Sequence, residues 1–478
     1  MVEMSVKEGL EMKNGSLLIL AVILLLLPLN GNAEKLPIRD FAEVKDRFVS
    51  NPRSVKDIGD PFVLQEEGEY LVFATGGPIG FNVWKSGDLT VFEKQKALKK
   101  VDWASGDYWA PEVFRVGEKY VMLFTARQRE SGSLRTGIAF ADAAEGPYED
   151  PLGHPLMDFG YATIDATLTW DDAGNPYLIY VQDCSENLVG SRHESHICGI
   201  LLAEDLLSVE GEPVLLLKPE GEWETKSGDT VWNEGPAVVR QDGKYYLYYS
   251  VNGYWMKEYS VSVAVSDAPL GPYTKQDNNP LLYYIGYGEN VTVSGPGHNA
   301  FFTVGEELFT AYHTHTYPQA PSGNRQLCVD RAGFHKDGTA YINGPTLALQ
   351  PKPLEETGSV NRMLSAVCEE DVDGLLTDGD LCMREGSEAW VWRGNRAVFH
   401  WPEGVRADLL MIWPAMGEAI SGSVTINTML TAKFDQPAAD KPGQAVILPF
   451  EEQSITSLQL DLANTANIGE IMLIGPKN

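Results

Sequence analysis

Four carboxylates and one histidine occupy similar places in this sequence, each at the start of a short apolar run. They are Asp60 in DPFVL, Glu112 in APEVF, Asp165 in IDATLTW, Glu234 in NEGPAVV and His298 in GHNAFF. Two carboxyl groups can cleave a glycosidic bond when one protonates the leaving oxygen and the other activates water or attacks the sugar. Crowded carboxyl groups raise one another's pKa, so a third acid can keep the proton donor protonated near neutral pH.

Each of these residues also has an ordinary structural interpretation. Asp60 precedes a proline and Asp165 precedes a strand, and both are places where aspartate commonly forms turns or caps. Glu234, before Gly-Pro, is less easily explained by local structure. The repeated pattern is therefore what favours a catalytic interpretation.

Five repeats are the elements that must bring these residues together. Each continues from its polar residue through an apolar strand and a turn to an aromatic-rich strand, as in WNEGPAVVRQDGKYYLYYS at 232–250. A unit of roughly 40 to 70 residues offers three or four short strands and almost no helical periodicity. Such repeats are typical of a β-propeller, in which the ends of the innermost strands converge on a central mouth. We therefore predict an all-β protein with a five-bladed β-propeller over 34–353, and equivalent positions for the five polar residues around its mouth.

A second domain is expected after the proline-rich linker at 351–353. Residues 359–478 contain short alternating runs such as AVFHW and SLQLDL, which are typical of a β-sandwich. The early TDGD and the closing GEIMLIG resemble discoidin-like, galactose-binding jelly rolls. Two interpretations stay open, namely a jelly-roll-like carbohydrate-binding module and a structural cap for the propeller.

The charge of the chain restricts its partners. The 478 residues carry a formal net charge of −30, which would repel phosphate backbones and disfavours nucleic-acid binding. Neutral sugars would not be repelled by such a surface. An oligosaccharide or polysaccharide substrate is consistent with this composition.

The amino terminus predicts export. Lys13 precedes the apolar run LLILAVILLLLPL, and small or polar residues follow up to a cleavage point after Ala33. The run is too short for a comfortable membrane span and suits the core of a signal peptide. We expect residues 1–33 to be a signal peptide, the mature chain to lack a membrane span, and the protein to be secreted or periplasmic.

Five cysteines leave two possibilities for an exported chain. Cys184 with Cys198, and Cys368 with Cys382, are close enough in sequence to form loop-closing disulfides, which would leave Cys328 unpaired. Alternatively all five are buried free thiols, since a chain of this size does not need covalent staples. The absence of CxxC spacing makes a cysteine metal site improbable.

A family resemblance rests on five motifs in order over about residues 55–340. DPFV, WAPEV, IDATLTWDDAGNPYLIY, NEGPAVVRQDGKYYLYYS and GPGHNAFF resemble those of family 43 glycoside hydrolases, five-bladed propeller enzymes that act on arabinose- and xylose-containing polysaccharides. The resemblance implies an inverting mechanism with Asp60 as general base, Asp165 as pKa tuner and orienting group, and Glu234 as general acid. In that family the WAPE motif carries no catalytic acid, so Glu112 is interpreted as structural or as a distant member of the network.

The resemblance also suggests substrate-binding residues. Trp109 would form a wall of the sugar site, although a tryptophan beside Ala-Pro is as often a core residue. Arg325, in GNRQLCVDRAG, matches the position where relatives place an arginine against the sugar hydroxyls. Arg331 follows on the same strand and competes for that role. A guanidinium near the acids would also lower their pKa values.

No cofactor is expected to be required, but one metal site is suggested. His298 resembles the histidine that helps to hold a hydrated calcium ion near the propeller axis of arabinan-cleaving relatives. Calcium prefers oxygen ligands, so such a site would consist mostly of water or carboxylate, and a hydrogen-bonded inner-strand histidine is the alternative. His313 and His315 share one face of a strand but have no third zinc ligand nearby in sequence, so we interpret them as structural or rim residues.

The predicted function is an exported, inverting glycoside hydrolase that releases α-L-arabinofuranose or β-D-xylose from plant cell-wall polysaccharides or their fragments. Two alternatives remain. A propeller that binds carbohydrate without catalysis would lack one of the acids, and a related propeller using phosphorolysis or fructosyl transfer would space its acids differently.

Overall fold

The computed structural model describes residues 33–77, 80–95, 101–287, 290–384 and 386–477. This part of the chain consists of β-strands and short 3-10 helices, without an α-helix. Residues 1–32 of the expected leader lie outside the described residues. In the described ranges, no helix has the length and apolar character needed to cross a membrane. The 3-10 helices are η1 (Phe41–Glu43), η2 (Lys45–Arg47), η3 (Glu222–Glu224), η4 (Arg362–Ser365), η5 (Glu388–Trp390) and η6 (Ala415–Gly417).

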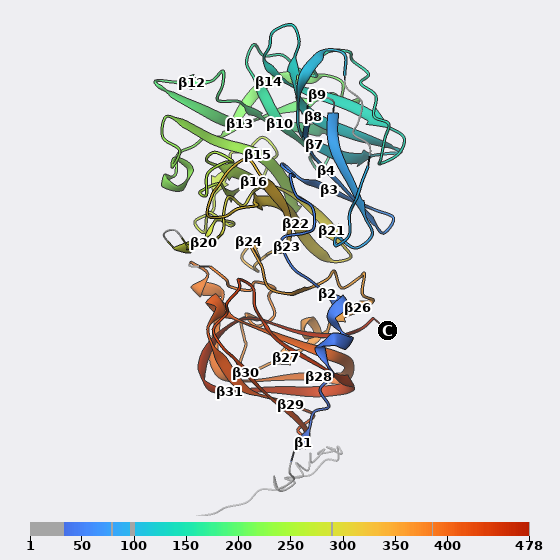
Figure 1. Cartoon of the computed structure of the whole chain (residues 1–478), viewed down its shortest axis with the longest axis vertical. Coiled ribbons are helices and arrows are strands. Elements are labelled where there is room, and N and C mark those ends of the chain that lie inside the picture. The colour runs from blue at the N-terminus through green and yellow to red at the C-terminus, as the bar shows by residue number, and fades with distance from the viewer. Residues whose placement is uncertain (1–32, 78–79, 96–100, 288–289, 385, 478) are drawn as a thin grey trace, which may run out of the picture.

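Five blades of antiparallel strands form the upper body in Figure 1. Blades 1 and 2 contain β3 (Phe62–Glu66), β4 (Glu69–Gly77), β5 (Gly80–Ser86) and β6 (Glu93–Lys94), then β7 (Ala104–Val116), β8 (Lys119–Gln128) and β9 (Leu134–Ala141). Blade 3 contains β10 (Thr163–Trp170), β11 (Pro176–Gln182), β12 (Leu188–Val189), β13 (Arg192–Leu202) and β14 (Val209–Leu217). Blades 4 and 5 contain β15 (Thr230–Gln241), β16 (Lys244–Val251), β17 (Ser260–Ser266) and β18 (Thr274–Lys275), then β21 (Gly297–Val304), β22 (Glu307–His315), β23 (Arg325–Phe334) and β24 (Ala340–Ile342). The five-bladed, all-β prediction is confirmed.

Burial on both faces explains why the second strand of a blade is so apolar. Along β16, Tyr246 and Tyr248 pack into the core shared with blade 5, whereas Leu247 and Tyr249 pack into the core shared with blade 3. Side chains alternate across a strand, so a strand packed between two neighbours buries both sets. The run KYYLYYS therefore forms the middle of a blade.

The segment before blade 1 closes the ring. It runs beside β23 of the last blade, with hydrogen bonds from Leu327 N to Val55 O (3.2 Å) and from Ile58 N to Arg325 O (3.2 Å). Further out, β2 (Phe48–Val49) pairs with β25 (Gln350–Pro351). A separate hairpin, β19 (Ile285–Tyr287) with β20 (Asn290–Val293), leads into blade 5.

The carboxyl-terminal body is a β-sandwich built on two long, bent strands. These are β28 (Trp392–Pro414) and β31 (Val446–Pro476), joined by β26 (Ser359–Asn361), β27 (Val367–Cys368), β29 (Ile420–Ile426) and β30 (Leu430–Gln436). Leu409 in β28 faces Ile474 on one side and Pro449 on the other, because β31 flanks it twice. The sequence runs AVFHW and SLQLDL, expected to be separate short strands, are parts of these two strands.

The first described residues pack with the sandwich and not with the propeller. β1 (Glu34–Lys35) pairs with β30, and Leu36 enters the sandwich core. Val44 and Phe48 join a second cluster with Trp413. Figure 1 shows this blue segment lying against the red and orange domain. Residues 34–49 thus belong physically with the last 120 residues of the chain, although the sequence suggested that they begin the propeller.

The five cysteines are free thiols, so the interpretation without disulfides is the correct one. Cys198 is buried in the apolar core between blades 2 and 3, whereas Cys184 lies beside Asp183 with its Sγ 3.7 Å from the carboxylate. Cys368 is half-buried in β27, and Cys382 is buried where its Sγ lies 3.4 Å from the carbonyl of Trp390. Closeness in sequence did not bring either pair together, because the chain places the two thiols of each pair in different environments.

The TDGD and GEIMLIG motifs meet at the junction between the two bodies. Glu470 accepts a hydrogen bond from Gly379 N (2.8 Å), and Asn343 of the propeller bonds to both Gly379 O (2.6 Å) and Leu381 N (2.9 Å). Asp380 and Glu470 are buried. These motif residues hold the sandwich against the propeller, as a structural cap requires.

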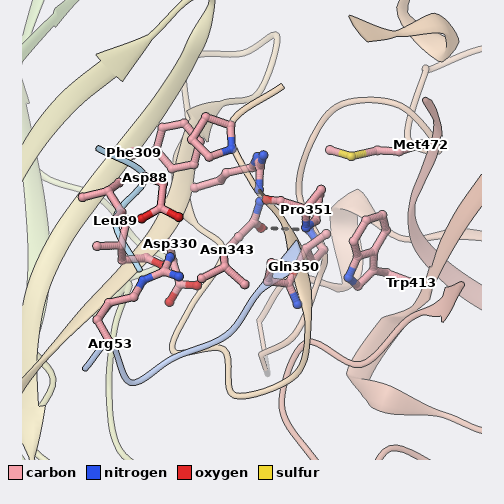
Figure 2. A pocket seen from close by; sticks show the side chains of 15 residues that line it. Arg53, Asp88, Leu89, Phe309, Asp330, Asn343, Gln350, Pro351, Trp413 and Met472 are labelled. Carbon is pink, nitrogen blue, oxygen red and sulfur yellow. Dashed lines mark hydrogen bonds between the residues drawn. The ribbon is translucent and has the colours of Figure 1, made fainter. Parts of the chain in front are cut away.

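A small cavity at this junction is also structural. Figure 2 shows Arg53 and Asp330 of the propeller on one side and Trp413 and Met472 of the sandwich on the other. Its volume of about 30 Å³ suits one or two water molecules and is too small for a sugar ring. The junction also contains two larger cavities, one of about 540 Å³ beside Tyr283 and Trp413 and one of about 680 Å³ beside Arg331 and Glu470, so it is packed only in part.

His335 is the charged centre of the junction. Its Nδ1 lies 3.1 Å from Asp378 and its Nε2 3.2 Å from Asp380, and its ring stacks on Trp390 at 4.4 Å. Burial alone would lower the pKa of His335, but bonding to the two carboxylates outweighs burial and raises the pKa. Burial raises the pKa of Asp378, because it disfavours the charged carboxylate, and the hydrogen bond from His335 opposes this effect. The positive charge of the imidazolium therefore stabilises the cluster.

Replacing His335 should weaken the junction in a pH-dependent manner. His335→Ala leaves two carboxylates facing each other and should cost about 3 kcal/mol. Because folding raises the pKa of His335, its contribution is fully present below its unfolded pKa of about 6.5 and is lost as pH rises through the folded value. Thermal unfolding should show a deficit in Tm that shrinks at alkaline pH. Exposed His400→Ala is the control, and a deficit equal at all pH values would contradict the assignment.

Candidate active site

The innermost strands of the five blades share a backbone feature at one end of the propeller, here called the mouth. In each blade one residue, which lies just before this strand or within it, has a left-handed conformation: Asp60 (φ 55°), Ala110 (φ 42°), Asp165 (φ 51°), Gly235 (φ 54°) and His298 (φ 50°). In blades 2 to 5 the strand pairing is interrupted at this residue. Such bulges re-aim side chains, and left-handed non-glycine residues are concentrated at functional sites.

This feature corrects the alignment of the five repeats. Asp60, Asp165 and His298 are equivalent, as expected, but the equivalent residue of blade 2 is Ala110 and that of blade 4 is Gly235. Glu112 and Glu234 were wrongly placed in the same set, because the polar residue is not at a constant distance from the bulge. The x-Pro steps at Asp60, Ala110 and Gly235 would have given the right alignment.

Each left-handed residue is held by the preceding blade. The backbone amides of Ala110 and Asp165 donate to the hydroxyls of Thr75 and Thr125, each at 3.0 Å. Equivalent bonds run from His298 N to Ser250 Oγ (2.7 Å) and from Asp60 N to His313 Nδ1 (3.3 Å). We call this set, together with the bond to Gly235, the interblade ring.

Blade 4 is the exception in the interblade ring. The position on β11 that matches Thr125 and Ser250 is Val181, which pairs with Ile164 and cannot accept a hydrogen bond. Gly235 N instead donates to the carboxylate of Asp165 at 3.1 Å. A carboxylate of blade 3 thereby fixes the backbone next to Glu234.

Asp60 is surrounded by a guanidinium and by hydrogen-bonding groups. Its Oδ1 lies 2.9 Å from the Arg325 guanidinium and 3.3 Å from His298 Nδ1, and its Oδ2 accepts from Thr75. Burial raises the pKa of this carboxyl, but the charge of Arg325, together with His298 and the Thr75 hydroxyl, outweighs it and holds the pKa well below its usual range. Asp60 is therefore ionised at neutral pH.

Glu234 and Asp165 have the opposite electrostatic character. Burial raises the pKa of Glu234 well above its usual value, and the neighbouring charge of Asp165 raises it further, although a 2.7 Å hydrogen bond from Tyr259 opposes this. Burial likewise raises the pKa of Asp165, against the opposing effect of His298. The mouth thus holds one carboxylate and a pair of carboxyls that bind protons more readily.

The two arginines expected on β23, Arg325 and Arg331, lie in different surroundings. The guanidinium of Arg325 lies over Gly59, where a Cβ would come within 2.0 Å of it, and bonds to Asp60. Arg331 lies six residues further along the strand, where it pairs with Glu307 at 2.7 Å and bonds to Pro351 O. Arg331 is therefore a structural residue of the junction side, and Arg325 is at the mouth.

Trp109 lies one residue before Ala110, in the position that matches Glu234 in blade 4. It is half-buried and packs against the cluster that contains Ile164 and Val181. Its partial exposure is compatible with a wall of the sugar site, which stays a prediction.

The histidines at the mouth bind neighbouring protein groups. The His298 ring packs against Gly235, and His315 bonds to Ser294 Oγ and Tyr254 O, each at 2.8 Å. Burial lowers the pKa of His313, so this imidazole is neutral and its Nδ1 accepts from Asp60 N. In the described ranges, no group of three His, Cys, Asp or Glu residues is arranged to hold a metal ion. A calcium ion beside His298 would need most of its ligands from water, and it stays a prediction.

Glu112 faces the propeller axis and not the mouth. It lines a cavity of about 290 Å³ whose walls come from all five innermost strands, among them Phe62, Thr167, Ala237 and Ala300. Burial raises its pKa to about 8, and its Oε2 has no hydrogen-bond partner among the described residues. Glu112 is thus a protonated group of the interior, in agreement with its non-catalytic interpretation.

Three residues near the acids were not predicted. Thr75 and Tyr259 bond to Asp60 and Glu234, and neither carries a recognisable motif. Asp183 is buried at the end of β11, and its charge raises the pKa of both Asp165 and Glu234. An acid two residues after the apolar run YLIYV was the available signal for Asp183.

A closed five-bladed ring that holds a carboxyl of lowered pKa and a carboxyl of raised pKa at one mouth has the two groups that a propeller glycoside hydrolase needs. The comparisons make this specific, because residues 49–340 match glycosyl hydrolases family 43. The chain belongs to this family, and like its other members it acts on O-glycosyl bonds.

Individual relatives agree with this assignment. The crystal structure of a thermostable family-43 glycoside hydrolase is 40% identical, with a TM-score of 0.60, over 64% of this chain and 98% of that chain. A β-D-galactofuranosidase from Aspergillus niger is 27% identical over 273 residues, 54% of this chain and 72% of that protein. An extracellular exo-α-(1→5)-L-arabinofuranosidase from Streptomyces chartreusis is 27% identical over 289 residues, 55% of this chain and 82% of that protein.

Removing the positive charge beside Asp60 should change the pH dependence of catalysis. In Arg325→Gln the pKa of Asp60 should rise by about 1 to 3 units, because an adjacent cation lowers a carboxyl pKa by that amount. The acidic limb of the kcat/KM profile should move to higher pH, whereas Arg325→Lys should move it less. Arg331→Gln, on the same strand, is the control. An unmoved acidic limb in Arg325→Gln would show that Asp60 is not the group that titrates.

Proposed function

We propose that the protein is an exported, inverting glycoside hydrolase that releases α-L-arabinofuranose or β-D-xylose from plant cell-wall polysaccharides or their fragments. The observation that carries the proposal is the contrast between Asp60 and Glu234, which lie in one contact network with opposite pKa shifts. An inverting hydrolase needs this combination of an ionised base and a protonated acid. The intact set of acids argues against a propeller that only binds carbohydrate.

Asp60 is the base in this proposal. Its Oδ1 is already occupied by Arg325 and His298, and its Oδ2 by Thr75, so the carboxylate is fixed in place before substrate binds. It would orient a water molecule on one face of the sugar and take its proton. Because the surrounding groups keep its pKa low, Asp60 stays ionised over most of the acidic range.

Glu234 is the acid and Asp165 its partner. Tyr259 holds one carboxyl oxygen of Glu234, and Asp165 holds the backbone amide of the next residue, Gly235. Burial and the charge of Asp165 keep the proton on Glu234 at neutral pH, from where it can be given to the leaving oxygen. Asp165 therefore both positions the backbone next to Glu234 and raises the pKa of Glu234.

The sugar and the location of the enzyme are inferred from the family and the sequence. The relative from Streptomyces chartreusis is named an arabinofuranosidase and extracellular, which together with the apolar run after Lys13 supports a pentofuranoside substrate and export. The relative from Aspergillus niger is named a β-D-galactofuranosidase, so a galactofuranoside is a further candidate beside the arabinofuranoside and the xyloside. L-arabinofuranose and D-galactofuranose are both furanoses and differ by one exocyclic carbon.

A substrate panel tests the proposal. Nitrophenyl α-L-arabinofuranoside, β-D-xyloside and β-D-galactofuranoside should be compared by kcat/KM, with linear arabinan as a polymeric substrate. Proton NMR of the first product should show the anomer opposite to that of the substrate. Retention of configuration, or a requirement for inorganic phosphate, would overturn the inverting hydrolytic mechanism.

The two catalytic acids should respond differently to the leaving group. Asp60→Asn should lower kcat by about 10²-fold or more on all substrates, because every bond needs the activated water. Glu234→Gln should do so on oligosaccharides but less on nitrophenyl glycosides, whose leaving group needs little protonation. Glu112→Gln, with a buried protonated carboxyl replaced by a neutral amide, should keep most of the activity. Circular dichroism should confirm the fold, and near wild-type oligosaccharide hydrolysis by Glu234→Gln would refute its role.

A further inference from the structure

Three aromatic side chains form a partly exposed surface beside the strand that carries Glu234. This surface, the aromatic ledge, consists of Trp232, Tyr254 and Trp255. Trp255 is in the centre, with ring centroids 5.2 Å from Trp232 and 5.2 Å from Tyr254, in edge-to-face contact with both. Tyr254 and Trp255 are 40% and 44% exposed. Exposed aromatic clusters of this kind mark binding surfaces more often than isolated exposed residues do.

The aromatic ledge is attached to both catalytic acids. Trp232 precedes Glu234 by two residues on β15, ahead of the bulge, so both side chains project from the same face of the strand. At the other end, the Tyr254 ring lies 4.8 Å from the guanidinium of Arg325, which bonds to Asp60. A molecule on the ledge would therefore lie next to the bond that Glu234 and Asp60 act on.

The loop that carries Tyr254 and Trp255 is firmly held. Asn252 donates to Trp223 O (2.8 Å) and Glu258 O (3.0 Å) across the base of the loop, and the carbonyl of Tyr254 bonds to His315 at 2.8 Å. The Trp255 ring lies on Gly253, where a Cβ would come within 2.9 Å of it. The aromatic side chains are thus exposed on an ordered backbone, which lowers the entropic cost of binding.

We propose that the aromatic ledge is the subsite for the sugar ring on the leaving-group side of the scissile bond. The inference rests on the proposed function, in which Glu234 protonates the leaving oxygen, so the group attached to that oxygen lies on the side of Glu234. Aromatic faces stack on the apolar faces of sugar rings without needing a charge on the ligand. The preferred substrate is then an oligosaccharide or polysaccharide in which another sugar follows the scissile bond.

The test compares substrates with and without a ring in the leaving group. Wild type and Trp255→Ala are assayed on a linear pentotriose and on the matching pentosyl fluoride, whose leaving group is a single atom. In Trp255→Ala, kcat/KM on the triose should fall about tenfold or more, while hydrolysis of the fluoride should be unchanged. Trp255→Phe should keep most of the activity on the triose. Leu364→Ala, an exposed apolar residue of the sandwich, is the control.

Calorimetry separates the subsite from the reaction. Glu234→Gln is titrated with the same pentotriose, with and without Trp255→Ala. Weaker binding after the second change supports the aromatic ledge even if wild type hydrolyses neither substrate, an outcome that would overturn the proposed function alone. An equal effect of Trp255→Ala on triose and fluoride, or unchanged binding and hydrolysis of the triose, would overturn the aromatic ledge while leaving the hydrolase assignment intact.

Discussion

The interblade ring is the interaction on which the mouth of this propeller depends. Every left-handed residue at the mouth would expose its amide in a buried place, and an unpaired buried amide is costly. Thr75, Thr125, Ser250 and His313 each satisfy the amide of the next blade. The same bonds join neighbouring blades and fix the backbone that carries Asp60, Asp165 and His298 at the mouth. Fold and site therefore share these hydrogen bonds.

The break in this pattern is also where the chemistry is concentrated. Since Val181 cannot accept a hydrogen bond, Asp165 accepts the amide of Gly235, which ties a carboxylate to the strand of Glu234. On the other side of the axis, Asp60 contacts Arg325, His298 and Thr75. The same burial that raises the pKa of Glu234 is overcome at Asp60 by these partners. Environment, more than residue type, divides the roles of the acids.

The sandwich is joined to the propeller beside blade 5, through residues that follow β23 and β24. The junction uses the TDGD motif and Glu470 of the sandwich together with His335 of the propeller. The first described residues of the chain are part of the sandwich itself. Residues 34–49 and 359–477 together cover this side of the propeller, so the closure of the ring and the attachment of the second domain are linked. The aromatic ledge, in contrast, belongs to the propeller alone.

Much of this architecture could be predicted from the sequence, because it depends on local patterns. The five repeats, the change of pattern near Pro351 and the acids at the starts of the inner strands follow from strand periodicity and turn residues. The contacts between blades could not be predicted from the sequence. Four features depend on which strands become neighbours in the folded protein. Glu112 faces the axis, Arg331 binds Glu307, the cysteines stay apart, and residues 34–49 join the sandwich. Thus the sequence by itself determined the kind of fold and the set of acids, whereas only the tertiary structure decided the bulge positions and the partners that set each acid's pKa, because both arise from contacts between distant segments.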